Sequence, residues 1–232
     1  MSLPQTVPSP AGAGPVVTGG LFVSIEGGDG SGKSTQSRLL GDWVTGCGLP
    51  VLLTREPGGT ELGRVLRQAV LHGEHLDART EALLYAADRA HHVASVVRPA
   101  LAAGAVVVTD RYLDSSVAYQ GTGRDLGGAE VEQLSLWATQ GLLPALTVLL
   151  DLDPEVGMHR LSARTAAPDR LESAGAEFHR RTREAFLARA QADPGRWLVL
   201  DAARPADQVA ADVRARVAAL LTARGTDLGA RG

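Results

Sequence analysis

The stretch that decides the fold runs from Leu21 to Ser34 and reads LFVSIEGGDGSGKS. Its second half, Gly27 to Ser34, matches the phosphate-binding pattern G-x-x-x-x-G-K-[ST]. Its first half is an apolar run typical of a buried strand, and a helical pattern follows, so the motif stands between a strand and a helix, as it requires. Glycines let backbone N–H groups turn toward a phosphate, and the N-terminus of the helix adds positive potential. The sequence therefore predicts a site for a nucleoside triphosphate.

Within this loop, two side chains have defined tasks. Lys33 is expected to reach the β- and γ-phosphates, and the Ser34 hydroxyl is expected to ligate Mg²⁺. Lys33 is the only lysine among 23 basic residues, which marks a position where arginine does not substitute. The alternative, a glycine-rich turn without a ligand, is weakened by the strand and helix around it. The residues expected to bind ATP are Gly27, Gly28, Asp29, Gly30, Ser31, Gly32, Lys33, Ser34 and Thr35.

Apolar runs elsewhere in the chain alternate with segments of helical period. Together with the first run they predict five strands, at Leu21–Ile25, Val51–Thr54, Ala105–Thr109, Ala145–Leu150 and Trp197–Leu200. The runs are continuous rather than alternating, as in parallel strands covered on both faces. The sequence thus predicts an α/β protein of the P-loop NTPase fold, with a five-stranded parallel sheet and helices on both faces. Ligands of such sheets bind at the carboxyl ends of the strands.

Length and composition set the organisation of the chain. Its 232 residues suit one domain, expected over residues 21–224, after a disordered leader at 1–20 and before a flexible tail at 225–232. No apolar run approaches the roughly 18 residues of a membrane span, no secretory signal is visible, and one cysteine excludes a disulfide framework. A net charge of −3 argues against a nucleic-acid partner. We expect a cytoplasmic protein.

Phosphate loops serve kinases, GTPase switches and ATPase motors. The chain contains no asparagine, so the Asn-Lys-x-Asp motif that reads guanine cannot occur. A single small domain suits a small-molecule kinase, which needs a second pocket for the acceptor and a lid that excludes water. The alternatives are another nucleoside or nucleotide kinase, or a nucleotide-binding switch that has no second substrate.

Two segments supply candidates for the acceptor pocket. The stretch 54–60 (TREPGGT) follows the second strand, where Arg55 is well placed to hold an acceptor phosphate. It also fits a Pro-Gly turn that caps a helix. Tyr85 and Arg89 are four apart on a predicted helix and share a face that suits a nucleobase. From this pair alone, a surface tyrosine and a salt-bridged arginine is the favoured interpretation.

A third segment follows the third strand. Asp110 ends that strand as the Mg²⁺-holding acid of phosphate-loop proteins does, but Asp151 ends the fourth strand in the same way, and position alone does not choose between them. Ser116, Tyr119 and Gln120 have the spacing i, i+3, i+4 and point the same way from a short helix.

Residues 160–173 are the candidate lid, with Arg160, Arg164 and Arg170 around small residues. One of these arginines is expected to close on the transferred phosphoryl group. The alternative is a solvated helix end rich in arginine, and we interpret the arginines at 180–183 as such a solvated face.

Together, IEGGDGSGKSTQ, TREPGGT, LLYAADRAHHV, TDRYLDSSVAYQG and DRLE with its flanking arginines resemble the thymidylate kinase family, in its bacterial type, over residues 21–217. The resemblance implies the fold of the nucleoside monophosphate kinases, the reaction of Mg-ATP with dTMP to give dTDP, and a homodimer. It also implies that Tyr85 stacks on thymine, that Arg89 bonds a base carbonyl, and that Tyr119 crowds the sugar 2′ position. The implied acceptor site is Arg55, Glu56, Pro57, Tyr85, Arg89, Arg111, Ser116, Tyr119 and Gln120.

The same resemblance implies the phosphate chemistry. Arg55 and Arg111 match the arginines that clamp the acceptor phosphate, and Asp29 matches an acid that positions that phosphate or its ion. The phosphate loop has a glycine where one type of the family carries its catalytic arginine, so Arg164 in the lid matches that arginine. The implied catalytic residues are Lys33, Arg164, Asp29 and Arg111, and the implied metal ligands are Ser34 and Asp110.

Overall fold

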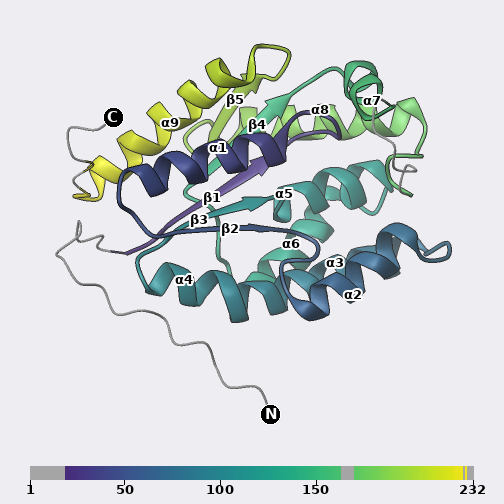
Figure 1. Cartoon of the computed structure of the whole chain (residues 1–232). Coiled ribbons are helices and arrows are strands. Elements are labelled where there is room, and N and C mark those ends of the chain that lie inside the picture. Colours follow the sequence, from purple (N-terminus) through teal and green to yellow (C-terminus); the bar gives the residue numbers. More distant parts are fainter. Residues whose placement is uncertain (1–18, 163–169, 227, 229–232) are drawn as a thin grey trace.

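The computed structural model describes residues 19–162, 170–226 and 228. Five strands form one parallel sheet in the order β2-β3-β1-β4-β5, which confirms the predicted α/β fold (Figure 1). The strands are β1 Leu21–Glu26, β2 Val51–Arg55, β3 Val106–Asp110, β4 Leu146–Asp151 and β5 Trp197–Asp201.

Each strand ends one residue later than its apolar run, at a charged side chain. β1, β2 and β3, which carry the three predicted motifs, are neighbours in the sheet, and Asp110 pairs in register with both Ile25 and Arg55. The charged ends of these strands therefore meet at one edge of the sheet, where parallel sheets bind ligands.

One face of the sheet is covered by α1 (Lys33–Gly46) and α9 (Ala206–Ala223). Side chains of β1 such as Leu21 and Val23 point to this face and pack against Leu40 of α1 and Val217 of α9, all almost completely buried. This apolar layer fixes α1 directly behind the phosphate loop.

The opposite face of the sheet carries a larger set of helices. Alternate strand residues such as Phe22 and Val107 point to it, as expected for the period of two along a strand. The elements that pack on this side or over it are α2 Glu61–His72, α3 Ala78–His92, the π-helix η1 Val93–Val97, α4 Arg98–Ala102, α5 Leu113–Ser116, the π-helix η2 Val117–Gly123, α6 Gly128–Thr139, α7 Pro154–Ser162 and α8 Ala176–Ala192.

The expectation that every strand is covered on both faces is wrong for the two edge strands. Leu53 of β2 and Val199 of β5 each expose 44% of their surface, because the helices cover the middle of a twisted sheet and leave parts of its edges open. Among the described helices, none has both the length and the apolar character needed to cross a membrane.

Candidate active site

The phosphate loop packs closely against the backbone of neighbouring elements. Gly27 and Gly30 have φ angles of 138° and 76°, which favour glycine. A Cβ on Gly30 would lie 2.3 Å from the carbonyl oxygen of Gly157, so the loop touches the backbone of α7 directly. Lys33 is buried, and its Nζ donates to the carbonyls of Gly27 (3.1 Å) and Gly28 (2.7 Å). Burial, and then the charge of Arg111, lowers the pKa of Lys33 to about 8.

The two competing acidic residues have different partners. Ser34 Oγ donates to Oδ2 of Asp110 at 2.9 Å, so the loop hydroxyl and this carboxylate stand together beside the phosphate site. Asp151 accepts two hydrogen bonds from the guanidinium of Arg183, at 2.7 and 2.9 Å. The interpretation of residues 180–183 as a solvated face therefore fits Arg180, which pairs with exposed glutamates, but is wrong for Arg183.

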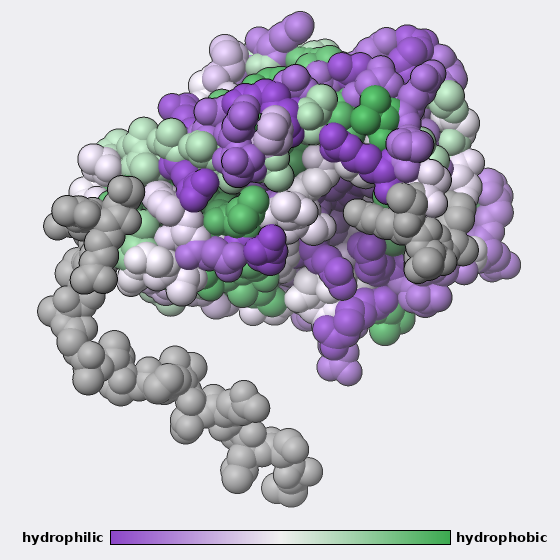
Figure 2. Space-filling model, turned by 45° about the horizontal axis from the view of Figure 1, so that its top comes forward, coloured by the Kyte–Doolittle hydropathy of each residue, from purple (hydrophilic) through white to green (hydrophobic). Residues whose placement is uncertain are grey.

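A cavity of about 240 Å³ opens at the carboxyl ends of β1, β2 and β3. Figure 2 shows a hollow with hydrophilic walls on this side of the molecule. All nine residues of the implied acceptor site line the cavity, together with Asp29, Lys33 and Ser34 of the phosphate loop. The lining residues that lie outside the predicted segments' named sites are Arg67, Leu71, Tyr112 and Ser115. Leu161, Leu171 and Glu172, which also line it, belong to the segment predicted as the lid.

Tyr85 and Arg89 line this cavity from one face of α3. Tyr85 exposes only 8% of its surface, so the surface alternative for the tyrosine is wrong. Arg89 is salt-bridged, as that alternative held, but to the buried carboxylate of Glu56, with Nε to Oε2 at 2.7 Å. The guanidinium also donates to Ser116 Oγ (3.0 Å) and Ser135 Oγ (3.2 Å).

Arg111 and Asp29 form an ion pair at the mouth of the phosphate loop. Arg111 adopts a left-handed backbone (φ 68°), and its Nη1 donates to the carbonyl of Gly27 at 3.1 Å. Burial acts to raise the pKa of Asp29, but the positive charges of Arg111 and Lys33 outweigh it and hold that pKa below its usual value. The hydroxyl of Tyr119 donates to Asp29 Oδ2 at 3.4 Å.

The segment that carries Ser116, Tyr119 and Gln120 differs from the predicted short α-helix. It begins as α5 and continues as the π-helix η2, a conformation frequent at functional sites. The three side chains still line one cavity. Gln120 Nε2 donates to Oε1 of Glu81 at 2.7 Å, which fixes its amide.

Glu81, which supports the wall of the cavity from behind through Gln120, was not predicted from the sequence. Its carboxylate is fully buried in the first turn of α3, where it contacts Gln120 of η2 and Arg170 of the segment predicted as the lid (2.6 Å). The signal was present, because Glu81, Tyr85 and Arg89 are spaced i, i+4, i+8 on one helix face. A glutamate in the first turn of a helix is usually explained by its favourable interaction with the helix dipole, so Glu81 was not selected as a candidate.

The lid is described at its two ends. Arg160 of α7 donates to the carbonyl of Ala202 at 3.2 Å, and Arg170 donates to the carbonyl of Val70 at 3.0 and 2.8 Å. The predicted catalytic arginine, Arg164, lies outside the described residues.

A phosphate loop after β1, an acid at the end of β3 and a neighbouring cavity lined by arginines are the features of a P-loop kinase that acts on a nucleotide. The family model for thymidylate kinase matches residues 25–213. Among curated proteins, the thymidylate kinases of Clavibacter michiganensis subsp. michiganensis and Leifsonia xyli subsp. xyli are 60% and 59% identical over 205 and 199 residues, which are 88% and 85% of this chain and 97% and 94% of theirs. The thymidylate kinase of Deinococcus radiodurans is 50% identical over 199 residues, which are 85% of this chain and 96% of its own.

The chain belongs to the thymidylate kinase family. It is a kinase that phosphorylates dTMP to dTDP.

Proposed function

We propose that ATP binds at the phosphate loop, dTMP binds in the adjacent cavity, and the γ-phosphoryl group passes directly and in line between them. One observation carries this proposal: Lys33, at the phosphate end, and Tyr85 with Arg89, at the base end, line the same cavity. A donor site and an acceptor site that share one space need no covalent intermediate.

In this proposal the acceptor is held at both ends. Tyr85 stacks on the thymine ring, and Arg89 with Ser116 faces its polar edge. Arg55 and Arg111 hold the 5′-phosphate, and Tyr119 closes the space beside the sugar 2′ position. Glu56, Pro57 and Gln120 complete the walls of the cavity.

The residues present fit a magnesium ion. Ser34 Oγ and Asp110 Oδ2 are adjacent, both are hard oxygen donors, and Mg²⁺ is commonly bound by one or two protein oxygens with phosphates and waters filling its other positions. Asp151 is the weaker candidate because Arg183 occupies both of its oxygens. When bound, the ion neutralises charge on the β- and γ-phosphates.

The protein's contribution to catalysis is then positioning and charge. Lys33 and the loop N–H groups stabilise the transferred group, and Arg164 supplies a further positive charge from the lid. Arg111, oriented by Asp29, aligns the acceptor phosphate. A phosphate monoester loses its second proton at about pH 6, so no strong general base is needed at neutral pH.

The test is a coupled assay of ADP release with Mg-ATP and dTMP, dUMP, UMP, dCMP, AMP or thymidine as acceptor. We expect strong turnover with dTMP, slower turnover with dUMP, weak but measurable turnover with dCMP, and the others near background. Turnover with thymidine but not dTMP would make the protein a nucleoside kinase, and ATP binding without any acceptor-dependent turnover would leave a binding module.

The lid assignment is tested by Arg164→Ala. Because the arginine is proposed to contact the group in transfer, we expect kcat to fall by about 10³ or more while KM for dTMP changes little. Arg180→Ala is the control, because in the described structure this arginine pairs with two exposed glutamates of its own helix, α8. A raised KM with an unchanged kcat would contradict the assignment.

We also propose a homodimer and a cytoplasmic location, with residues 21–224 as the kinase domain. Large apolar side chains stand exposed on α2, α3 and α6, which pack side by side: Leu62 and Val65, Leu83, and Trp137. Such a group of side chains is better covered by a second copy of the chain than left in water.

A further inference from the structure

A line of buried hydrogen bonds runs behind the base-reading arginine. Thr54 Oγ1 at the end of β2 lies 2.7 Å from Nε2 of His92, whose Nδ1 lies 2.8 Å from Oε1 of Glu56. The other oxygen of Glu56 accepts from Nε of Arg89 at 2.7 Å. The side chains of His92, Glu56 and Arg89 each expose 2% or less.

The chemistry of the carboxylate fixes the direction of these bonds. An ionised carboxylate only accepts, so Nδ1 of His92 carries a hydrogen and donates it to Glu56. The hydroxyl of Thr54 then faces Nε2 of the ring. His92 thus ties Glu56, in the loop after β2, to the strand itself.

The loop backbone is packed around this contact. A Cβ on Gly59 would lie 2.6 Å from Nε2 of His92 and 2.8 Å from Oγ1 of Thr54, so only glycine fits. The loop after β2 (residues 54–60) therefore packs against the end of α3 (residues 87–92) at His92.

Arg89 depends on Glu56 more than on its other partners. Its remaining hydrogen bonds, to Ser135, Tyr112 and Ser116, are longer (3.0–3.3 Å) and go to uncharged oxygens. These bonds and the bond to Glu56 use four of the five N–H groups of the guanidinium, which lines the acceptor cavity. Without a partner on Oε1, the carboxylate of Glu56 is free to turn, and its contact with Nε turns with it.

We propose that His92 is a positioning residue for base selection: through Glu56 it holds Arg89 in the orientation that reads the thymine carbonyl. This inference rests on the base-reading role proposed for Arg89. It assigns a task to a fully buried histidine that does not itself line the acceptor cavity. The competing account is a core histidine that only fills space.

Two conservative variants separate these accounts. In His92→Asn the amide nitrogen takes the place of Nδ1, so the bond to Glu56 is kept and the bond to Thr54 is lost. In His92→Gln the amide takes the place of Nε2, so the bond to Thr54 is kept and the bond to Glu56 is lost. Both remove the ring and one hydrogen bond, and they differ from each other by one methylene group, which His92→Phe controls for by keeping a ring without an N–H.

The measurement is kcat/KM for dTMP and for dCMP, whose amino group replaces the carbonyl, at saturating Mg-ATP. We expect His92→Gln to lower the dTMP-to-dCMP preference by roughly tenfold or more, the usual scale for a hydrogen bond to a charged group. We expect His92→Asn to keep most of the preference, and KM for ATP to stay unchanged in both. His92→Phe has no N–H and serves in place of the glutamine variant if that one does not fold.

Equal effects of the asparagine and glutamine variants on the preference would overturn the inference. Arg89→Lys, assayed alongside, distinguishes this failure from that of the proposed function. If Arg89→Lys loses the preference and His92→Gln does not, only the role of His92 is wrong. If Arg89→Lys also keeps the preference, the base-reading role of Arg89 is wrong and the inference falls with it.

Discussion

Among single residues, the arginines of the acceptor cavity differ in what holds them before a ligand binds. Arg89 and Arg111 are each paired with a carboxylate, and those pairs fix their orientation. Arg55 is exposed, and within the described residues its side chain makes no hydrogen bond or ion pair. A cation without a protein partner at the edge of a nucleotide cavity is available for a phosphate.

Arg55→Ala therefore tests binding without disturbing the fold. We expect kcat/KM for dTMP to fall by about 10- to 100-fold, the scale of a lost charged hydrogen bond, with most of the change in KM. The free energy of unfolding should stay within about 0.5 kcal/mol of the wild type, because an exposed side chain without a hydrogen bond or ion pair in the described structure is removed. Arg38→Ala on α1, which removes an exposed salt bridge to Asp42, is the control. Unchanged dTMP kinetics would remove Arg55 from the site.

Glu26 shows how burial at the site changes pH dependence. Burial, and then the negative charge of Asp114, raises the pKa of Glu26 from its ordinary 4.5 to about 8. Its oxygens accept from the N–H of Tyr112 (2.8 Å) and from Ser115 Oγ (2.5 Å). The folded protein thus holds a proton that the unfolded chain releases, so the stability that this proton provides is lost as pH rises from about 4.5 through 8.

Glu26→Gln removes this titration and leaves the shape of the side chain. Its amide oxygen accepts from Tyr112, and its amide nitrogen donates to Ser115. We expect the unfolding free energy of the variant, relative to the wild type, to rise by about 3 kcal/mol between pH 5 and pH 8 without nucleotide. Glu155→Gln, which changes an exposed residue of α7, is the control: its unfolding free energy relative to the wild type should not change with pH. A flat difference for Glu26→Gln as well would refute the buried proton.

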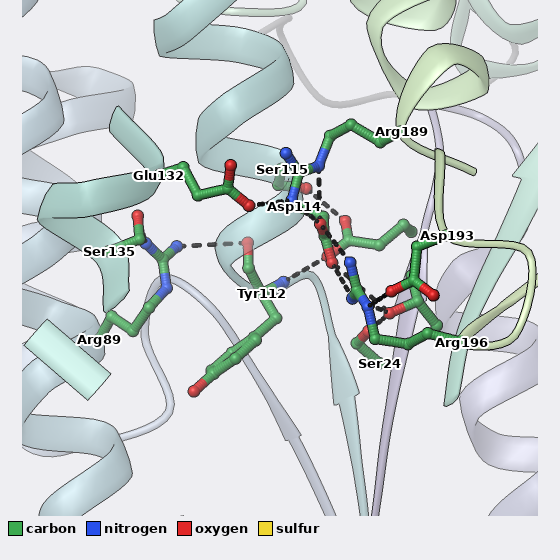
Figure 3. Close-up of polar contacts among 12 residues, drawn as sticks. Ser24, Arg89, Tyr112, Asp114, Ser115, Glu132, Ser135, Arg189, Asp193 and Arg196 are labelled. Atoms are coloured by element: carbon green, nitrogen blue, oxygen red, sulfur yellow. Dashed lines mark hydrogen bonds and ion pairs between the residues drawn. The ribbon is translucent and has the colours of Figure 1, made fainter. Parts of the chain in front are cut away.

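Among the elements, a buried ion cluster joins the segment after β3 to the C-terminal part of the sheet (Figure 3). The carboxylate of Asp114 on α5 is fully buried between two arginines, Arg189 of α8 and Arg196 before β5. Arg196 also donates to Thr147 Oγ1 of β4 at 2.8 Å. This one carboxylate thus holds α8, β4 and the start of β5 against the helix that leads to Ser116.

Asp114→Asn should be strongly destabilising, because it removes the buried counter-charge of two largely buried guanidinium groups and leaves them only their more exposed partners, Glu132 and Asp193. We expect a loss of about 3 kcal/mol in the free energy of unfolding, measured with urea at neutral pH. Glu132→Gln alters the partly exposed partner of Arg189 and should cost less than about 1 kcal/mol. Similar losses for the two variants would show that the buried carboxylate of Asp114 contributes no more to stability than the partly exposed carboxylate of Glu132.

The elements also show what the sequence permits one to predict. The strands were predictable because five continuous apolar runs have few other uses in a chain of this length. Each strand extends one residue past its run, to a charged side chain such as Glu26 or Asp110, which hydropathy alone excludes. The π-helix η2 was not predictable, because its extra residue per turn is set by tertiary contacts rather than by local sequence.

Residues of the site that belong to a sequence motif were predictable. Pairs that are joined only by a contact in the folded chain were not. Every motif residue predicted for the acceptor that the structure describes lines one cavity. Asp151 pairs with Arg183, which lies 32 positions away in the sequence. The hydrogen bonds from Thr54 and Glu56 to His92 join two separate motifs, 38 and 36 positions apart. No spacing along the chain indicates such pairs, because the fold alone brings them together.

In the whole molecule, the strand order explains why three motifs make one site. β2 and β1 lie on either side of β3, so the segments after all three strands open onto the same edge. α7 follows β4 on the other side of β1, and its Gly157 meets the phosphate loop at Gly30. The described ends of the segment proposed as the lid, residues 160–173, therefore lie on α7, which touches the phosphate loop, and at Arg170, which contacts Glu81 behind the acceptor cavity.

The exposed apolar side chains of α2, α3 and α6 give the last prediction. Trp137 on α6 exposes 80% of its surface, and Val65 on α2 and Leu83 on α3 expose 64% and 57%. These helices stand together on one side of the molecule, away from β5 (Figure 1). Aromatic side chains at the centre of an interface contribute much of its binding energy, so the proposed dimer should depend on this tryptophan.

We therefore expect the protein to have the mass of a dimer in sedimentation or light scattering, and Trp137→Glu to give a folded monomer. Placing a charge at the centre of an apolar interface costs several kcal/mol on each side of a two-fold contact, which is enough to shift the equilibrium at micromolar concentration. Val199→Glu, an equivalent change on the distant edge strand β5, should leave the dimer intact. If Trp137→Glu stays dimeric, the copies meet elsewhere; if the wild type is itself a monomer, the exposed side chains of α2, α3 and α6 do not form an interface between copies.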